Sequence, residues 1–486
     1  LPEQDREAVG QDAFRGGRSG GLTQSASSVS EPGADRSSRE ARGYSRRVES
    51  TQLRQPWAWE ETRGPTLGPT REGTAVAYDD GAVGVYLHIP FCERICPYCD
   101  FPVVAARRLE PAVEARTVAG LLAELEARAP DFAGRSLATI YLGGGTPSLF
   151  SPASIRRLIE AVRAAFPDAP ARPGPPGPVE TTLELNPSSV ERARLPGFRE
   201  AGVDRLSVGV QSFDDLQLKR LGRAHRAPVA LETLAAARAA GFGNLSVDLI
   251  FAGPGQTPAD LDRDLERLLE VAPDHVSTYE LTWEPETPFG RAWAAGRMQA
   301  CDEDRAAAMI ERIESRLEVG GFERYEISSH ARPGRRARHN ARYWQRQAVL
   351  GLGMGAHSTE ARSPQRPHGA RRANPRRLEA WLEAVEQGRP AGQEETLSPA
   401  SARGEAVFLA LRQREGLDAA RFEAEFGAPP RGFFETEIER LVHCGWLVED
   451  KEGGKGDLWL SRAGRLVADS VAAEFVVAAG DAEEAP

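Results

Sequence analysis

A repeated alternation of strand-like and helix-like segments limits the fold of this chain more than any other feature. Six apolar runs of strand length, each ending in glycine or polar residues, occupy residues 83–91, 137–145, 180–187, 204–212, 244–255 and 275–285. Apolar residues at three- and four-residue spacing, typical of amphipathic helices, recur in 113–128, 154–165, 228–240, 259–271 and 305–319. Strands that alternate with helices predict a parallel sheet. Six such units fit an open or partial β/α barrel, in which chemistry gathers at the strand C-termini.

Composition narrows the class of protein. The 486 residues include 61 Lys plus Arg and 71 Asp plus Glu, so the formal net charge is −10, and 41% of the residues are apolar. This predicts a globular protein with a sizeable core and weighs against nucleic acid as a partner. The sequence predicts neither a membrane span nor a secretory signal. Five cysteines are too few for a disulfide framework and indicate a reducing compartment, by default the cytoplasm.

The same patterns divide the chain into four regions. Residues 1–80 are rich in Ser, Gly, Arg, Glu and Pro without periodicity, which predicts a disordered extension, and the β/α units fill residues 81–320. Residues 321–397 are expected to form an accessory, connecting region. From residue 398 to residue 486, helical patterns followed by GWLVED, a glycine turn and LWL predict a winged-helix-like domain with an acidic tail. The expected fold class is therefore α/β, with a partial (β/α)6 barrel and a C-terminal winged-helix-like accessory domain.

Three of the five cysteines lie within eight positions, directly after the first predicted strand. They are Cys92, Cys96 and Cys99, in the pattern CxxxCxxC. Thiolates so close in one loop can converge on one soft metal centre, either zinc or an iron–sulfur cluster. Three ligands leave one iron of a four-iron cluster open for a substrate or cofactor, whereas a structural zinc site needs a fourth Cys or His. Cys301 and Cys444 are expected to be ordinary buried cysteines.

The cysteine motif and several further motifs resemble one family. CxxxCxxC after the first strand, with Tyr98 beside the third cysteine, resembles the cluster motif of the radical S-adenosylmethionine (SAM) superfamily. Seven segments occur in the order seen in coproporphyrinogen III dehydrogenase-like proteins: YLHIPFC, YLGGGTPS, ELNP, RLSVGVQSF, LGRAH, VDLIFAGPGQT and HNARYW. This resemblance implies a radical SAM barrel with bound SAM and a [4Fe–4S] cluster on the three cysteines.

Position 101 separates two branches of that family. The oxidase branch has a further cysteine two positions beyond the third, and here that position is Phe101. CPYCDF and HNARYW resemble instead the heme chaperone (HemW-like) branch, whose members bind heme and pass it to acceptor proteins. The resemblance thus implies heme as a third cofactor, with acceptor apo-hemoproteins and an electron donor as partners. The alternatives are an oxygen-independent coproporphyrinogen III dehydrogenase, which decarboxylates propionate side chains oxidatively, and a zinc-stabilised winged-helix binding module.

Glycines and polar residues at the strand ends form the expected cofactor site. GGGTP at 143–147 removes Cβ atoms where the backbone can approach a ligand, although a tight strand-to-helix turn has the same pattern. Carboxylates and amides at strand ends can hold ribose hydroxyls and an α-amino group, and an arginine in the next loop can hold a carboxylate. By resemblance, the positions that contact SAM are Tyr86, Tyr98, Gly144, Gly145, Thr146, Glu184, Gln211, Arg223 and Asp248.

His339 is the candidate heme ligand. It precedes the aromatic residues Tyr343 and Trp344, so it could bind heme iron while the rings stack on the macrocycle; a packed core histidine fits the pattern equally well. Eight arginines could meet heme propionates, although a solvated basic face is the preferred interpretation. They are Arg335, Arg336, Arg338, Arg342, Arg371, Arg372, Arg376 and Arg377. His88 is expected to be structural.

Overall fold

Six parallel strands form the centre of the molecule, and each lies on one of the predicted apolar runs. The computed structural model describes residues 79–166, 178–360, 362–363, 365–389, 392–450 and 456–484. Its central strands are β1 (Ala82–Ile89), β4 (Ser136–Gly144), β5 (Glu180–Leu185), β6 (Arg205–Gln211), β7 (Asn244–Phe251) and β8 (His275–Glu280). The predicted strands of the partial barrel are therefore confirmed. The extension predicted for residues 1–80 lies outside the described residues except for its last two positions.

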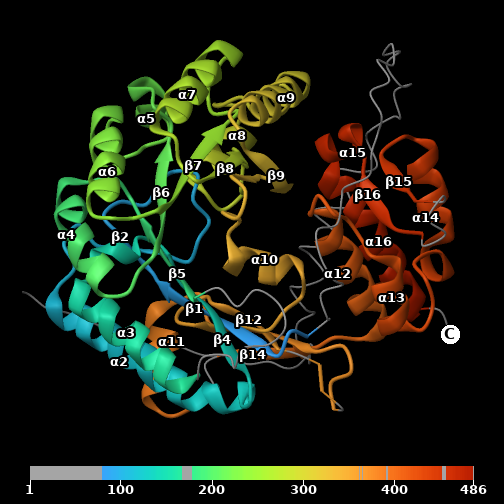
Figure 1. Cartoon of the computed structure of the whole chain (residues 1–486), viewed down its shortest axis with the longest axis horizontal. Coiled ribbons are helices and arrows are strands. Elements are labelled where there is room, and N and C mark those ends of the chain that lie inside the picture. Colours follow the sequence, from blue (N-terminus) through green and yellow to red (C-terminus); the bar gives the residue numbers. More distant parts are fainter. Residues whose placement is uncertain are drawn as a thin grey trace, which may run out of the picture. The chain divides into compact units, whose positions relative to one another are not determined.

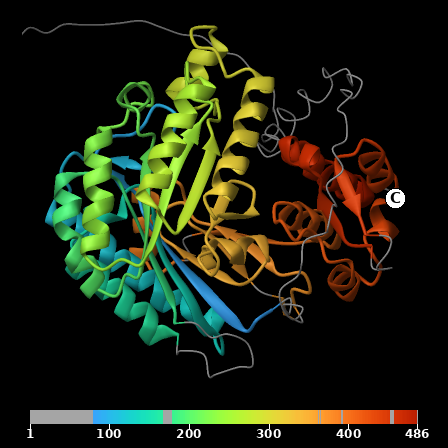
Figure 2. The ribbon, with the colours of Figure 1, turned by 45° about the horizontal axis from the view of Figure 1, so that its top comes forward.

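Helices cover the outer side of these strands (Figures 1 and 2). Five of them match predicted helices: α2 (Pro111–Arg128), α3 (Pro152–Ala165), α6 (Ala227–Ala239), α7 (Pro258–Val271) and α9 (Glu303–Val319). Two more, α4 (Ser189–Glu200) and α5 (Asp215–Arg220), were not predicted. In α4 the helical pattern is interrupted by Pro196, and the helix begins where the Ser188 side chain accepts a hydrogen bond from the Glu191 amide.

The sheet continues beyond the six central strands on both sides. Its order is β14-β13-β12-β11-β1-β4-β5-β6-β7-β8-β10-β9. The added strands are β9 (Glu323–Glu326), β10 (Ser329–Ala331), β11 (Val349–Leu352), β12 (His357–Glu360), β13 (Ala370–Ala373) and β14 (Gln393–Thr396). Of these, β11 pairs with β1 in parallel, and the others pair antiparallel. The segment expected to connect two domains thus contributes strands to the main sheet, together with α10 (Arg338–Trp344) and α11 (Leu378–Glu386).

The two faces of the central strands have different chemistry. In β6, the side chains of Leu206, Val208 and Val210 are fully buried in the core between strands and helices. The residues between them are Arg205, Ser207, Gly209 and Gln211, which face the opposite side because side chains alternate along a strand. The inner face of the sheet is therefore polar, and the functional side chains described below lie on it.

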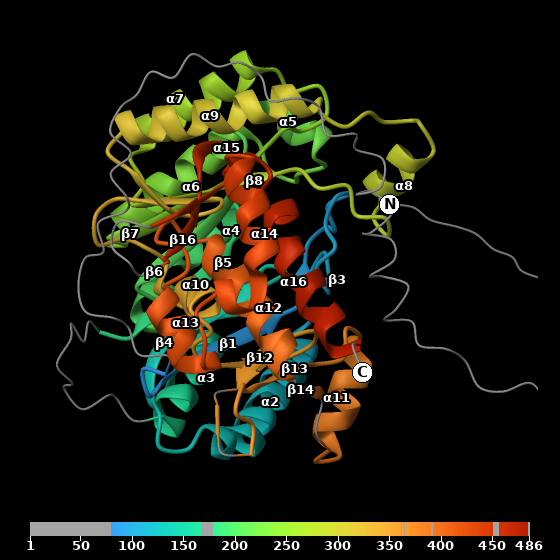
Figure 3. The ribbon, with the colours of Figure 1, turned by 90° about the vertical axis from the view of Figure 1, so that its right-hand side faces the viewer.

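The C-terminal residues form helices followed by a small antiparallel wing, as predicted (Figure 3). The elements are α12 (Pro399–Leu411), α13 (Ala419–Phe426), α14 (Arg431–His443), β15 (Leu447–Glu449), β16 (Leu458–Leu460), α15 (Arg462–Leu466) and α16 (Ala468–Glu484). They have a core of their own, in which Phe434 meets Phe475 edge-on at 5.3 Å between ring centroids. The prediction that Cys444 is buried is wrong, because this cysteine directly follows α14 and is exposed.

None of the described helices combines the length and the apolar character that a membrane-spanning helix requires.

Candidate functional site

The three motif cysteines lie in one loop at the carboxyl end of β1. Two short parallel strands, β2 (Phe91–Cys92) and β3 (Val104–Ala105), close this loop, and the Val104 amide donates to the Pro90 carbonyl at 2.7 Å. Residues 92–102 are called the cysteine loop below. All three cysteines are partly buried and free of disulfides. Their side chains are therefore available as ligands next to the polar face of the sheet.

A chain of hydrogen bonds links Cys92 to Cys96 across three strand ends. The Thr146 hydroxyl lies 3.6 Å from the Cys92 Sγ and accepts a hydrogen bond from Asn186 Nδ2 at 2.7 Å. The Asn186 carbonyl oxygen accepts from the Arg223 guanidinium, which also donates to the Cys96 Sγ at 3.4 Å. Arg223 is anchored by a further bond to the Gly209 carbonyl at 2.8 Å. The structure thus brings Thr146 and Arg223 to the cysteine side of the site.

The spacing of the thiols suits a cluster better than a single ion. Among the residues that the structure describes, no three His, Cys, Asp or Glu side chains lie close enough to hold one metal ion. In an iron–sulfur cluster each thiolate binds a different iron, so the ligands need not converge on one point. Burial raises the pKa of the Cys92 thiol to about 11, and a thiolate there needs the positive charge of a metal centre. Three partly buried thiols in one loop therefore fit an iron–sulfur cluster.

The glycines after β4 bring two chain segments into close contact. A Cβ atom on Gly145 would lie 2.6 Å from the Phe91 carbonyl oxygen, directly before Cys92. The Gly145 amide donates to the Ile89 carbonyl at 2.9 Å, and the Gly144 amide donates to the Glu184 carboxylate at 3.0 Å. Both amides therefore have partners within the protein. The missing Cβ at Gly145 allows β4 to pack against the start of the cysteine loop.

Two carboxylates lie deeper on the polar face. Glu184 accepts hydrogen bonds from the Tyr141 hydroxyl at 2.7 Å and from the Gly144 amide, and Asp248 accepts from the Ser207 hydroxyl at 3.0 Å. Burial, with repulsion from Asp248 as a further cause, raises the pKa of Glu184 to about 7. Burial also raises the pKa of Asp248. Two desolvated carboxylates favour a cationic ligand, and SAM carries both an ammonium and a sulfonium group.

Gln211 and Arg223 have buried polar atoms that lack partners among the described side chains and backbone. These atoms are Gln211 Oε1 and Arg223 Nε. Gln211 also has a φ of 67°, which is strained for a residue with a side chain and is common at binding sites. Unpaired buried polar atoms are costly, so a ligand that hydrogen-bonds to them would be stabilising. Both atoms fit the expected contact with SAM.

Tyr86 lies in β1, and Tyr98 lies in the cysteine loop. His88 Nε2 donates to the Pro102 carbonyl at 2.9 Å, which leaves Nδ1 to accept from the Tyr86 hydroxyl at 2.9 Å. Tyr98 packs against Phe289 of α8 (Pro288–Ala294), with 6.3 Å between ring centroids, and Arg223 lies beside its hydroxyl. His88 therefore links β1 to the end of the cysteine loop.

His339 belongs to α10, and its ring lies among the aromatic rings of Tyr86, Tyr141 and Tyr343. Its side chain is 1% exposed, with Nδ1 2.8 Å from the Thr139 hydroxyl and Nε2 3.4 Å from the Tyr343 hydroxyl. Its ring centroid is 5.0 Å from that of Tyr141. Burial lowers its pKa to about 3, so the ring is neutral. The ring of His339 also lies 6.3 Å from that of Tyr86, and both of its nitrogens lie beside hydroxyl groups.

Most of the eight candidate arginines have acidic or carbonyl partners. Arg342 pairs with Asp80 at 2.9 Å and Arg336 pairs with Glu415 at 2.8 Å. Similar contacts hold the side chains of Arg335, Arg338, Arg371, Arg372 and Arg376. For Arg377 no side-chain partner is found among the described residues. A basic surface ready to receive propionates is therefore not formed by these arginines.

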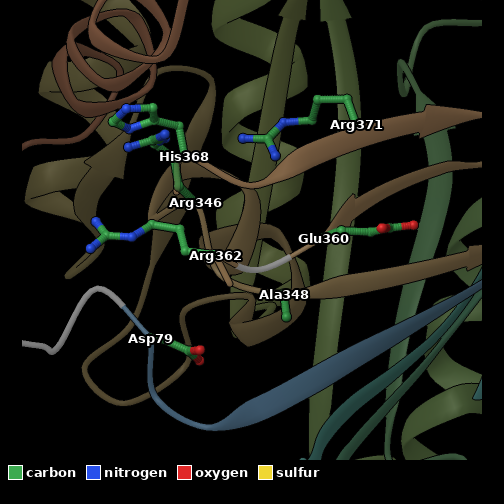
Figure 4. A pocket seen from close by; sticks show the side chains of 7 residues that line it. All are labelled: Asp79, Arg346, Ala348, Glu360, Arg362, His368 and Arg371. Carbon is green, nitrogen blue, oxygen red and sulfur yellow. The ribbon is translucent and has the colours of Figure 1, made fainter. Parts of the chain in front are cut away.

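A small cavity lies away from the cysteine loop, within a network of ion pairs (Figure 4). Its lining residues are Asp79, Arg346, Ala348, Glu360, Arg362, His368 and Arg371. Its volume of about 20 Å³ leaves room for little more than one water molecule. Arg346 pairs there with Glu405 and Glu425, each at 2.9 Å. We assign this network to packing between the main sheet and the C-terminal helices.

Three residues that the sequence did not single out complete the site. Asn186 connects Thr146 to Arg223, Tyr141 donates to Glu184, and Ser207 donates to Asp248. Asn186 belongs to the quoted ELNP motif, so the motif contained a signal for it. Tyr141 and Ser207 could have been found by alternation, since each lies on the inner face of a strand that ends in the site.

Two family models match the chain. The model of the radical SAM superfamily matches residues 86–268, and that of the HemN C-terminal domain matches residues 397–467. The first range includes the cysteine loop and all nine positions expected to contact SAM. The second begins just before α12 and ends after α15.

Curated relatives match most of the chain. A protein named heme chaperone HemW from Bacillus subtilis (strain 168) is 31% identical over 80% of this chain and 98% of its own length. The mitochondrial radical S-adenosyl methionine domain-containing protein 1 of Bos taurus is 34% identical over 89% of this chain and 93% of its own length. Among solved structures, coproporphyrinogen III oxidase (HemN) from Escherichia coli has a TM-score of 0.67 and 23% identity, covering 81% of this chain and 90% of that one. This last likeness shows a shared fold.

Proposed function

The chain belongs to the heme chaperone HemW family of the radical SAM superfamily, and from this membership we propose that it binds heme and passes it to acceptor apo-hemoproteins. The observation that carries the proposal is the extent of the likeness, because the Bacillus relative is matched over 98% of its length. The match spans 395 residues, which is 80% of this chain. The function proposed is therefore that of the whole relative.

Phe101 supplies a local argument for the chaperone. Its side chain is 67% exposed, at the position where the oxidase branch has a fourth cysteine. The next most exposed apolar residue of the cysteine loop is Ile95, at 43%. Neither side chain is a metal ligand. The loop therefore presents three thiols and an apolar rim, which favours the chaperone over the oxygen-independent dehydrogenase.

We further propose that Cys92, Cys96 and Cys99 hold a [4Fe–4S] cluster and that SAM lies between the cysteine loop and the inner face of the sheet. Membership of the radical SAM superfamily implies both groups, and the reduced cluster, when bound, supplies the electron for cleavage of SAM. Glu184 and Asp248 would meet the cationic groups of SAM, while Gln211 and Arg223 would bond to it through their unpaired atoms. Support comes from the desolvated carboxylates and from these unpaired polar atoms.

The heme ligand remains a prediction at His339. Binding of heme iron by Nε2 would require loss of the 3.4 Å contact with Tyr343 and movement of a side chain that is 1% exposed. The proposal of heme binding does not depend on this residue. Substitution of His339 by Ala, followed by heme titration, decides whether it is the ligand.

We place the chain in a reducing compartment, the cytoplasm in a bacterial setting, with an electron donor and apo-hemoproteins as partners and no nucleic acid. The five cysteines are free, which is the expected state in such a compartment. Fractionation of cells that carry the tagged full-length protein tests this placement.

An anaerobic heme titration of the cluster-loaded full chain tests the function. We expect a Soret band that saturates near one heme per chain and heme that is then released to an added apo-hemoprotein. The matched control replaces Cys92, Cys96 and Cys99 by Ala, which should abolish cluster iron. Incubation with coproporphyrinogen III, SAM and a reductant is run in parallel. Vinyl product at catalytic turnover, without heme transfer, would favour the dehydrogenase instead.

A further inference from the structure

Two segments from the region after the barrel lie against the cysteine loop. Residues 353–356 follow β11, and residues 374–376 follow β13. The two segments are bonded to each other, because the Gly355 amide donates to the Pro375 carbonyl at 2.9 Å and the Asn374 amide donates to the Ala356 carbonyl at 2.9 Å. They are called the support segments below. Their sequences, GMGA and NPR, belong to none of the quoted family motifs.

A single buried carboxylate fixes both support segments. Glu124 of α2 is 3% exposed and accepts three hydrogen bonds. The donors are the Gly353 amide at 2.8 Å, Asn374 Nδ2 at 2.7 Å and Trp381 Nε1 at 2.9 Å. Asn374 Nδ2 also donates to the Gly353 carbonyl at 2.8 Å. Buried networks with every member satisfied are rigid, so the support segments have a fixed position on the barrel.

The support segments contact the cysteine loop at two points. The Arg376 guanidinium donates to the carbonyl oxygen of Asp100, the residue after Cys99, at 2.6 Å. Gly355 packs against Pro102 so closely that a Cβ atom would lie 2.4 Å from the Pro102 Cγ. Its φ of 67° also favours glycine. The end of the loop that carries Cys99 is therefore held from outside the barrel as well as by the bond from His88 of β1 to the Pro102 carbonyl.

The start and the middle of the cysteine loop are held differently. The Phe289 amide of α8 donates to the Pro97 carbonyl at 3.0 Å, and Arg223 bonds to Cys96. Cys92 bonds to Thr146. For Cys99, no such side-chain donor is found among the described residues; its amide donates to the Cys96 carbonyl at 3.1 Å. The position of Cys99 thus depends on the chain around it.

We propose that the support segments 353–356 and 374–376, fixed by Glu124, position Cys99 for cluster binding, with Arg376 as the positioning residue. The inference rests on the proposed function in one respect, that the loop carries a cluster. Arg376 acts through Asp100, whose carbonyl lies 2.6 Å and whose carboxylate lies 3.6 Å from its guanidinium. Its side chain is 61% exposed, so its removal should leave the core intact.

The test measures thiol reactivity in the cluster-free full chain. Rates of alkylation by iodoacetamide are read for each cysteine by mass spectrometry, with the exposed Cys444 as an internal reference. Loss of the hydrogen bond to the Asp100 carbonyl and of the exposed ion pair with its carboxylate should let the loop open more often, so Cys99 should be alkylated about 2- to 10-fold faster in R376A. The matched control is R377A, which removes the same charge from the next residue and should leave the rate unchanged. Equal rates in R376A, R377A and the wild type, or equal acceleration in both variants, would overturn the proposal.

A second pair of variants tests the contact at Gly355. G355A adds a Cβ against Pro102, whereas G334A adds one at a similar φ of 74° with nothing within 4 Å. Faster alkylation of Cys99 in G355A, but not in G334A, supports the proposal because backbone strain is matched. Acceleration of the same size in both would contradict it.

A third readout uses the cluster itself. After reconstitution, R376A should show an altered electron paramagnetic resonance line shape of the reduced cluster, with the melting temperature equal to that of R377A. An unchanged line shape, together with unchanged alkylation, would remove Arg376 from this role. If the wild type takes up no iron, the proposed function fails, while the alkylation result still decides whether the support segments position the loop.

Discussion

Replacement of Glu184 by Gln should stabilise the ligand-free protein in alkaline solution and weaken its binding of SAM. Burial raises the pKa of Glu184 to about 7 from an ordinary value of 4.5. Between these two pH values the folded chain keeps a proton that the unfolded chain has released. The free energy of unfolding therefore falls as the pH rises, and the total cost reaches about 3 kcal/mol at pH 8.5. A glutamine side chain at this position does not titrate, and its amide group can still accept from the Gly144 amide and donate to the Tyr141 hydroxyl.

The assay is urea unfolding of the cluster-free full chain at about pH 5.5 and about pH 8.5, on either side of the raised pKa. Other groups also titrate in this range, so the useful quantity is the change in the wild type minus the change in E184Q. With the pKa above, this double difference should be about 2 kcal/mol, as an upper estimate. E160Q is the control, because Glu160 of α3 is exposed, and it should behave as the wild type. A double difference near zero would refute the reasoning that burial shifts this carboxyl.

The same variant separates stability from binding. A charge-assisted hydrogen bond from an ammonium to Glu184 is worth enough that E184Q should bind SAM about 10- to 100-fold more weakly, measured by calorimetry on the cluster-loaded chain. A more stable protein with weaker binding is the expected result for a site that holds a buried charge for its ligand. Unchanged affinity would show that Glu184 does not hold SAM, whatever its pKa.

Three further predictions follow from the geometry. R346M should lower the free energy of unfolding by about 1.5–3 kcal/mol, because the buried Glu425 carboxylate loses one charged hydrogen-bond partner and keeps Arg362 at 3.2 Å; a melting curve checks this, with unchanged iron content as the control. When the pH is lowered from about 7 to about 5, the free energy of unfolding should fall by about 2 kcal/mol more in the wild type than in H339Q. The reason is that burial lowers the pKa of His339 to about 3, so the unfolded chain binds the proton at a higher pH than the folded chain does. Equal decreases in urea unfolding would contradict this. F101C should leave the cluster spectrum unchanged and give no vinyl product from coproporphyrinogen III, because the side chain at position 101 is 67% exposed; catalytic turnover would count against the chaperone.

The central fold could be predicted because each barrel strand carries its own signal. Helices bury one side of each strand, so in β7 the apolar residues Leu245, Val247 and Leu249 alternate with polar residues of the inner face. The strands β9 to β14 have three or four residues each, too few for a period to be visible. Their place in the sheet follows from pairing with distant strands, such as Gly84 with Val349. Local sequence patterns do not contain that information.

The sequence indicated separate residues of the candidate site but not the contacts between them. The spacing of Cys92, Cys96 and Cys99 identified the loop, and the strand ends gave the carboxylates. The hydrogen bonds that join these parts connect distant residues, 54 positions apart for Cys92 and Thr146 and 127 positions apart for Cys96 and Arg223. Asn186 is central to these bonds, although an Asn-Pro pair is typical of a turn. A contact between distant residues also explains Gly145, which was expected to let the backbone approach a ligand. A Cβ atom on Gly145 would lie 2.6 Å from the Phe91 carbonyl oxygen, so this glycine allows two chain segments to pack together.

The region after the barrel belongs to the site as well as to the sheet. β11 pairs with β1 on the side opposite β4, and Val349, Leu350 and Leu352 of this strand are 0% exposed. A chain that ended at residue 320 would leave β1 as an unpaired edge, and β1 is the strand that leads into the cysteine loop. It would also lack His339, which packs against Tyr141, and the support segments that contact Asp100 and Pro102. The barrel carries the candidate ligands, and the segment 321–397 pairs with β1 and contacts the cysteine loop, so we expect a chain cut at residue 320 to lose the geometry of the candidate site.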